Sequence, residues 1–149
     1  MYKVIQLTDQ TVGAVAPGAL MPLGNITRRY GCTCNRGGQT FEVSTSGSDT
    51  ITIFEDGYYH LTYVGSLTAG AVGEIILNLL VNGAEIISSA ETVAAVGDTA
   101  NITIHYVIRV LPNCCSVVVN NPAIVQIQLD ADSVALTGGT SNIVIEKVK

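Results

Sequence analysis

Short apolar runs separated by turn residues are the feature that most limits how this chain can fold. Seven runs are rich in Val, Ile, Thr and Tyr, which strands favour. They are Asp49–Phe54, Tyr58–Val64, Glu74–Val81, Ala100–Val110, Cys115–Val119, Ala123–Leu129 and Asn142–Val148. Gly, Asn, Asp and Pro gather between them, where the chain must reverse. We therefore predict an all-β chain, an antiparallel sandwich or jelly roll.

Alternation within the runs indicates strands that have one buried face. In Ala123–Leu129, apolar side chains alternate with Gln126 and Gln128. In Ala100–Val110, one face is predicted to carry Ile102, Ile104, Tyr106, Ile108 and Val110. Asn82-Gly83 between two apolar runs predicts a hairpin with a type I′ turn.

Two segments depart from the strand pattern. Ser88–Gly97 is compatible with one helical turn and little more. Ile26–Gln39 holds three of the seven basic residues, two cysteines and three glycines, so we predict a long surface loop there.

The chain is long enough for one domain and carries little charge. Its 149 residues are 48% hydrophobic and only 13% charged, whereas about a quarter is usual in a soluble protein. So few charged residues cover a monomer poorly, and we expect part of the apolar surface to lie against other subunits.

The charge distribution and hydropathy argue against nucleic acid and membrane partners. The net charge is −5, and no Lys or Arg lies between Arg36 and Arg109, so there is little to neutralise a phosphate backbone. No apolar run reaches the roughly 20 residues that a membrane helix needs. The first residues lack the basic-then-apolar order of a secretory signal, so we expect synthesis in the cytoplasm without an export tag.

No combination of residues predicts catalysis. His60 and His105 each lie inside a predicted strand without a neighbouring acid at ligand spacing, and no serine sits in a Gly-x-Ser-x-Gly motif. Asp130 and Asp132 have residue types that bind calcium, but an acidic turn after a strand is the commoner meaning. We predict that the protein is not an enzyme and uses no cofactor or metal.

The four cysteines come in two close pairs, Cys32 with Cys34 and Cys114 with Cys115. Zinc sites use wider spacings within a pair, and near-adjacent cysteines rarely form a relaxed disulfide. A bridge between the two pairs stays open, as does a metal site. We favour four reduced thiols that act as small apolar groups, although their redox state and role do not follow from sequence.

The aromatic residues gather in one stretch, and this stretch resembles a known superfamily. The segment "DGYYHLTYVGSL", followed by "EIILNLLVNGAEI", resembles the central strands of the complement-type globular head and the tumour-necrosis-factor-like (TNF-like) jelly roll. The segment "PGALMPLGN" (Pro17–Asn25) is similar to the opening of the C-terminal domain of bacterial and phage collagen-like proteins. The resemblance covers roughly Pro17 to Lys149, through short and tolerant motifs.

The resemblance implies a ten-stranded sandwich that assembles as a tight homotrimer. On this basis residues 1–24 form an extended N-terminal anchor or first strand segment, and residues 25–149 form the TNF-like domain. One face of the aromatic strand would fill the core and the other would meet the neighbouring subunits. The predicted trimer-interface residues are Tyr58, Tyr59, His60, Tyr63 and Tyr106.

The departures from the resemblance shape the functional hypothesis. No Gly-X-Y repeat precedes the domain. We expect a non-enzymatic phage virion protein at the virion surface, a homotrimeric capsid decoration or head or tail fibre protein. Its other partners would be the major capsid protein or other virion proteins, contacted through Arg28, Arg29 and Arg36. The alternative is a trimeric module on a virion, spore or cell surface that binds a receptor or a host-surface glycan.

Overall fold

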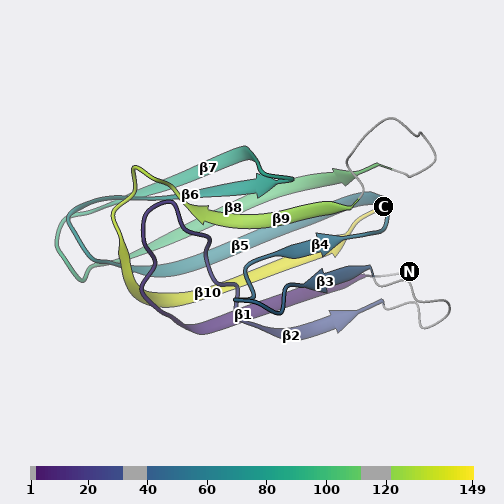
Figure 1. The fold of residues 1–149 in the computed structure, drawn as a ribbon, viewed down its shortest axis with the longest axis horizontal. Coiled ribbons are helices and arrows are strands. Elements are labelled where there is room, and N and C mark those ends of the chain that lie inside the picture. Colours follow the sequence, from purple (N-terminus) through teal and green to yellow (C-terminus); the bar gives the residue numbers. More distant parts are fainter. Residues whose placement is uncertain (1–2, 32–39, 112–121) are drawn as a thin grey trace.

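The computed structural model describes residues 3–31, 40–111 and 122–149, and this part of the chain contains ten strands and no helix. Figure 1 shows the strands running along the long axis of the molecule. They are β1 (Val4–Val12), β2 (Asn25–Tyr30), β3 (Phe41–Val43), β4 (Ile51–Ile53), β5 (Gly57–Ala69), β6 (Gly73–Val81), β7 (Ala84–Val93), β8 (Thr99–Val110), β9 (Ala123–Leu129) and β10 (Leu136–Lys147).

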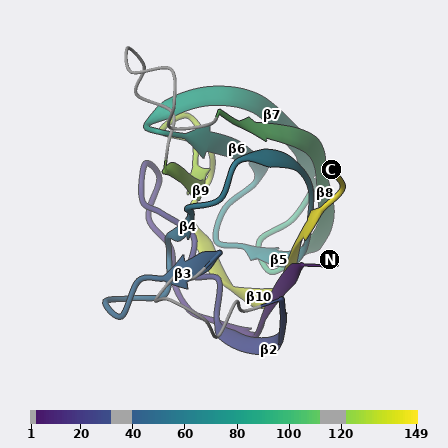
Figure 2. The same ribbon diagram turned by 90° about the vertical axis from the view of Figure 1, so that its right-hand side faces the viewer.

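The strands form two five-stranded antiparallel sheets packed face to face, which Figure 2 shows from the end. Sheet A has the order β2-β1-β10-β5-β8, and sheet B has the order β3-β4-β9-β6-β7. Most neighbours within a sheet are far apart in sequence, so the chain crosses between the layers repeatedly. This arrangement confirms the predicted antiparallel jelly-roll sandwich.

The core lies between the sheets and follows the alternation of the strands. In β9, Val125, Ile127 and Leu129 are fully buried, and Gln126 and Gln128 lie on the other face. In β8, the inward positions from Ile102 to Val110 are buried except at Tyr106. Period-2 patterning therefore identified the buried face of both strands correctly.

The N-terminal segment contributes directly to the sandwich. Strand β1 lies between β2 and β10 in sheet A. The chain then passes over the sheets: Val15 exchanges backbone hydrogen bonds with Leu136, and the Met21 amide donates to the Ile127 carbonyl at 2.7 Å. Met21 and Leu23 are fully buried. This segment therefore covers one flank of the core.

Two local predictions were wrong and one was confirmed. Ser88–Gly97 forms no helical turn, because its first part continues β7 and pairs with β6 along the whole hairpin. Within the predicted loop Ile26–Gln39, the first residues belong to β2, whose pairing with β1 outweighs their polar composition. Asn82 and Gly83 have φ values of 52° and 81°, as the predicted type I′ turn requires. The predicted strand Cys115–Val119 lies outside the described residues.

Candidate functional site

The aromatic strand β5 divides its side chains between two environments. Tyr59 and Tyr63 point into the core and are fully buried, whereas Tyr58 is 42% exposed and His60 is also exposed. The predicted trimer-interface residues therefore do not form one surface.

Tyr59 and Tyr63 belong to the core of the single chain. The Tyr59 ring meets Phe41 edge to face at 5.8 Å, and its hydroxyl donates a hydrogen bond to the Glu55 carbonyl at 2.8 Å. Burial raises the pKa of Tyr63 to about 12 and also raises the pKa of Tyr59. Neither side chain has surface to offer a partner, so we assign both to folding and not to assembly.

The outward side chains of sheet A form a broad surface with little charge, which we call the outer face. Cross-strand pairing from β1 through β10 and β5 to β8 sets its rows. The three central rows are Val4–Glu146–His60–Val107, Gln6–Val144–Thr62–His105 and Thr8–Asn142–Val64–Thr103, although Val4 itself is covered and only 1% exposed. Of these twelve residues only Glu146 is an acid and none is Lys or Arg. The outer face therefore costs little to remove from water compared with an ordinary charged surface.

Polar groups on the outer face bond to one another, and apolar groups are exposed between them. Asn142 Oδ1 accepts hydrogen bonds from Gln6 Nε2 at 2.8 Å and from Thr8 Oγ1 at 3.0 Å. Val64 and Val107 are 42% and 51% exposed. A surface with internally satisfied polar groups and exposed aliphatic groups is suited to contact with another protein.

Both histidines of the chain lie on the outer face. The rings of His60 and His105 are stacked, with centroids 6.2 Å apart and planes inclined by 26°. His105 Nδ1 lies 3.2 Å from Thr62 Oγ1. At the end of the same face, the guanidinium of Arg109 lies over the Tyr58 ring at 5.7 Å.

The margin where β7 and β8 meet exposes further apolar side chains. Tyr106 occupies an inward position of β8 yet is 36% exposed, whereas Ile104 and Ile108 on the same side of the strand are buried. On β7, Ile86 and Ile87 are 42% and 37% exposed, and they lie where the register between β6 and β7 shifts. We call Ile86, Ile87 and Tyr106 the open margin; it is a second apolar surface beside the outer face.

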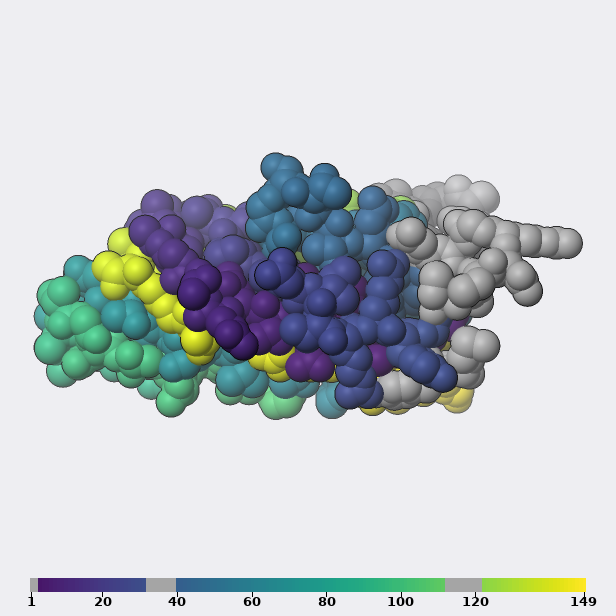
Figure 3. Space-filling view, turned by 90° about the horizontal axis from the view of Figure 1, so that it is seen from below, coloured from purple at the N-terminus to yellow at the C-terminus, as the bar shows by residue number. Residues whose placement is uncertain are grey.

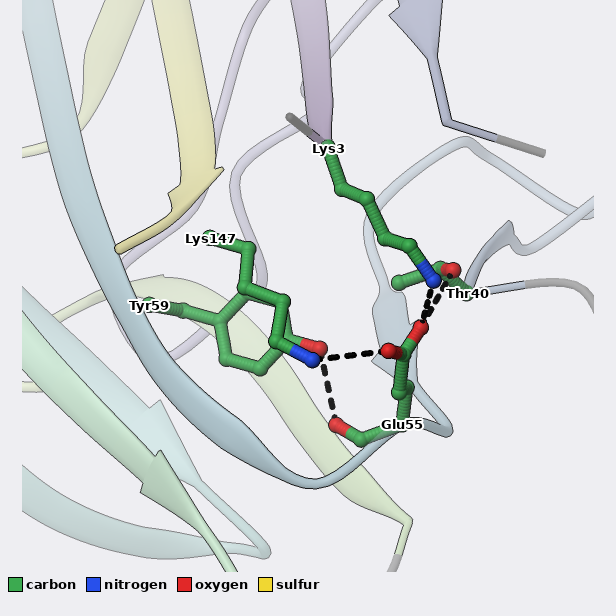
Figure 4. A network of polar contacts seen from close by, with 5 residues as sticks. All are labelled: Lys3, Thr40, Glu55, Tyr59 and Lys147. Carbon is green, nitrogen blue, oxygen red and sulfur yellow. Dashed lines mark hydrogen bonds and ion pairs between the residues drawn. The ribbon is translucent and has the colours of Figure 1, made fainter. Parts of the chain in front are cut away.

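A polar network joins the two ends of the described chain at one end of the sandwich (Figure 4). The Glu55 carboxylate accepts hydrogen bonds from Lys3 Nζ, from Lys147 Nζ at 2.7 Å and from Thr40 Oγ1 at 3.0 Å. Burial alone would raise the pKa of Glu55, but these donors lower it from 4.5 to about 2. The network holds β1, β5 and β10 together, and its carboxylate is fully engaged, so we give it a structural role.

The predicted shell-contact residues are only partly described. Arg28 and Arg29 lie on β2, whose six residues are all exposed; Figure 3 shows this strand in dark blue on the surface seen from below. The Arg29 side chain donates to the Phe41 carbonyl at 2.5 Å. Arg36 and all four cysteines lie outside the described residues, so the alternatives for the cysteines stay open.

The acidic turn after β9 is held by its own hydrogen bonds. Asp130 Oδ2 accepts from Asn78 Nδ2 at 2.7 Å, and Oδ1 accepts from the Asp132 amide at 2.8 Å. The Asn78 bond lowers the pKa of Asp130, with help from the Asp132 amide. Across residues 3–31, 40–111 and 122–149, no three His, Cys, Asp or Glu side chains are grouped to hold a metal ion. In the same part of the chain, no helix is long and apolar enough to span a membrane.

Comparison with solved structures identifies the architecture. The structure of Eiger TNF from S. frugiperda superposes with a TM-score of 0.68 at 8% identity, covering 100% of this chain and 92% of that one. The chain has the TNF-like jelly-roll fold. The globular domain of zebrafish complement 1qA protein matches with a TM-score of 0.63 at 10% identity, covering 98% of this chain and 96% of the other.

A viral protein shares the TNF-like fold. The PRD1 vertex protein P5 matches with a TM-score of 0.63 at 19% identity, over 99% of this chain and 97% of its own. Neither a protein-family model nor a curated protein sequence matches this chain. The likeness therefore concerns the fold, and the resemblance drawn from the sequence to the TNF-like superfamily is confirmed at that level.

Sequence reasoning missed most of the outer face. Gln6, Asn142 and Val144 contribute to it, but each lies on β1 or β10, far from the aromatic stretch in sequence. The alternation in Asn142–Val148 could have marked Val144 as outward. Only the register between strands, which no local pattern encodes, places these residues in the same rows as the residues of β5.

Proposed function

We propose that the protein is a non-enzymatic structural component of a phage virion, a homotrimer that decorates the capsid or forms a head or tail fibre. The observation that carries the proposal is the outer face of sheet A, a partly apolar surface with little charge on a TNF-like fold. The low charge of the chain leads us to expect an apolar surface that is buried against another subunit, and the outer face fits this expectation.

Two different surfaces support a ring of subunits. The outer face and the open margin are adjacent but not the same, so one copy can present its margin to the outer face of the next. Contacts between unlike surfaces close into a ring when the rotation allows, and a ring of three satisfies every copy equally. In this arrangement Tyr58, His60 and Tyr106 are interface residues, and Tyr59 and Tyr63 support the strand from inside.

The likeness to a vertex protein supports the location. That viral protein matches over nearly its whole length and is more similar in sequence than the Eiger and complement structures, although 19% identity supports only a shared fold. The engaged carboxylates of Glu55 and Asp130 leave neither acid poised to act as a catalytic base, which supports a non-enzymatic role.

The solution mass tests the assembly. Light scattering coupled to size exclusion should give about 47 kDa, three times the 15.6 kDa of one chain. A stable 15.6 kDa species at micromolar concentration would overturn the homotrimer. Mass spectrometry of purified particles tests the location, because a virion component must be recovered with the capsid proteins.

We also propose that Arg28 on β2 contacts an acidic patch of a shell protein. Arg28 lies on an exposed edge strand, and it is a positive charge on a chain whose net charge is −5. An acidic partner would therefore be attracted to this part of the surface more than to the rest. Arg28→Ala should lower binding to particles that lack the protein, measured by co-sedimentation, and should weaken its salt dependence. Arg28→Lys keeps the charge and is the matched control; equal binding of all three proteins would contradict the contact.

A further inference from the structure

Two loops at one end of the sandwich share a short apolar sequence that ends in an acid. Where β5 turns into β6, residues 71–74 read Ala-Val-Gly-Glu, and between β7 and β8, residues 95–98 read Ala-Val-Gly-Asp. Figure 1 shows both loops at the end of the molecule opposite to the labelled termini. We call residues 70–74 and 94–98 the tip.

Backbone hydrogen bonds hold the loops of the tip side by side. The Ala69 amide donates to the Asp98 carbonyl at 3.0 Å, and the Gly97 amide donates back to the Ala69 carbonyl at 2.9 Å. The Gly70 amide donates to the Ala135 carbonyl at 2.8 Å, so the turn after β9 lies beside them. The tip is therefore one continuous surface made by three connections of the sandwich.

The tip exposes apolar side chains that the core does not use. Val72 is 62% exposed and Val96 is 66% exposed, and neither belongs to the core cluster. Ala94 and Ala95 are exposed as well, so three consecutive apolar residues face water in one loop. Loops are usually polar, and a run of exposed apolar residues generally marks a functional surface. Folding thus gives no reason for these valines, whereas contact with a partner does.

Acidic residues flank the apolar tip, and no basic residue belongs to it. Glu74 and Asp98 directly follow the two Ala-Val-Gly segments, Glu91 lies on β7, and Asp130 and Asp132 lie on the turn after β9. Neither residues 37–108 nor residues 110–146 contain a Lys or Arg. The charge around the valines is therefore of one sign.

We propose that the tip is a docking site for a protein surface that has apolar side chains at its centre and Lys or Arg around them. Covering the two valines removes apolar area from water, and the flanking acids attract a basic surface and repel an acidic one. The proposal uses no residue of the outer face or of β2, so it stands apart from the homotrimer and from the Arg28 contact.

NMR of the whole chain with labelled valine methyl groups tests the proposal, with two synthetic peptides as probes. In one peptide Lys alternates with Leu, and in the other Lys alternates with Ser. The Lys-Leu peptide should shift the signals of Val72 and Val96 and bind about tenfold more tightly than the Lys-Ser peptide. Val148 is the matched control, because it is also 62% exposed but follows β10 at the other end of the molecule.

Two double variants separate the apolar contribution from the charge contribution. Val72→Ser/Val96→Ser should lower the affinity for the Lys-Leu peptide about tenfold, whereas Val148→Ser should leave it unchanged. Glu74→Gln/Glu91→Gln should lower the affinity and weaken its dependence on salt. All these side chains are on the surface, so the remaining valine signals should keep their positions.

Two results with the peptides would overturn the proposal: equal shifts at Val148 and at the tip valines, or equal affinity for the two peptides. Phosphatidylcholine vesicles, added without peptide, should leave all the valine signals in place. Shifts of Val72 and Val96 with vesicles alone would overturn the protein partner and assign the tip to a lipid surface. None of these outcomes affects the homotrimer, which light scattering tests separately.

Discussion

Tyr58 and Tyr59 are neighbours in sequence, yet Tyr58 lies on the outer face and Tyr59 lies in the core. Tyr59 is fully buried against Phe41, and Tyr58 is 42% exposed beneath Arg109. One strand thus supplies the core at every second residue, and the residues between lie on the outer face that we propose for assembly. The aromatic residues of β5 are therefore shared between the core and the outer face.

The comparison is sharpest when a large side chain is removed from each surface. Tyr59→Ala deletes a buried ring and should lower the free energy of unfolding by about 3–5 kcal/mol, measured by urea denaturation. Tyr58→Ala removes an exposed ring, so its effect on a dilute, dissociated chain should stay within about 0.5 kcal/mol. Equal losses from both variants would show that the inner and outer faces do not differ as described.

A charge placed on the outer face should break assembly and leave folding intact. Val64→Lys forces a desolvated cation into the proposed contact and should weaken association at least about 100-fold, seen as a monomer by light scattering. Ile124→Lys on β9 is the matched control, because Ile124 is 38% exposed on the outward side of sheet B. The contact would be misplaced if Ile124→Lys dissociated the trimer and Val64→Lys did not.

The Glu55 network should make the folded chain sensitive to strong acid. The pKa of Glu55 falls from 4.5 to about 2 on folding, so its ion pairs contribute fully above about pH 4.5 and are lost as the pH falls through about 2. With allowance for a side chain that is 32% exposed, the contribution is about 2 kcal/mol.

Denaturant unfolding at several pH values between 4.5 and 2 checks this expectation. Glu55→Gln should be less stable than the wild type at pH 6 and should lose less stability on acidification. If the free energy of unfolding fell equally with pH in both proteins, Glu55 would not be the cause of the acid sensitivity.

The smallest expected effect separates the Tyr59 ring from its hydroxyl. Tyr59→Phe keeps the packing against Phe41 and deletes the hydrogen bond to the Glu55 carbonyl, which should cost about 1 kcal/mol. Thermal unfolding should therefore rank this variant close to the wild type and far above Tyr59→Ala. A cost as large as that of the alanine variant would mean that the hydroxyl, and not the ring, secures this part of the core.

Sequence was a good guide where the controlling contacts are local. The bounds Ala123–Leu129 were predicted to the residue, and the hairpin at Asn82-Gly83 follows from two residues that tolerate positive φ. The antiparallel sandwich followed from alternation and turns.

Sequence was a poor guide where contacts join distant residues. Gln6 and Asn142 are 136 positions apart, and only the pairing of β1 with β10 brings them together. The burial of Tyr59 and Tyr63 could not be separated from the exposure of Tyr58 and His60, because alternation shows two faces without saying which is inner. The exposure of Tyr106 was missed as well, because alternation assigns it to the same side of β8 as the buried residues Ile104 and Ile108.

The Glu55 network has a consequence for the engineering of this chain. Lys3 and Lys147 meet on one carboxylate, and Val4 pairs directly with Glu146, so the backbone enters and leaves the sandwich at neighbouring points. A short flexible linker between these points would close the chain into a circle, which could then be reopened at the exposed Asn82-Gly83 turn. The circular permutant would carry new termini beside the open margin, and every strand pairing would be retained.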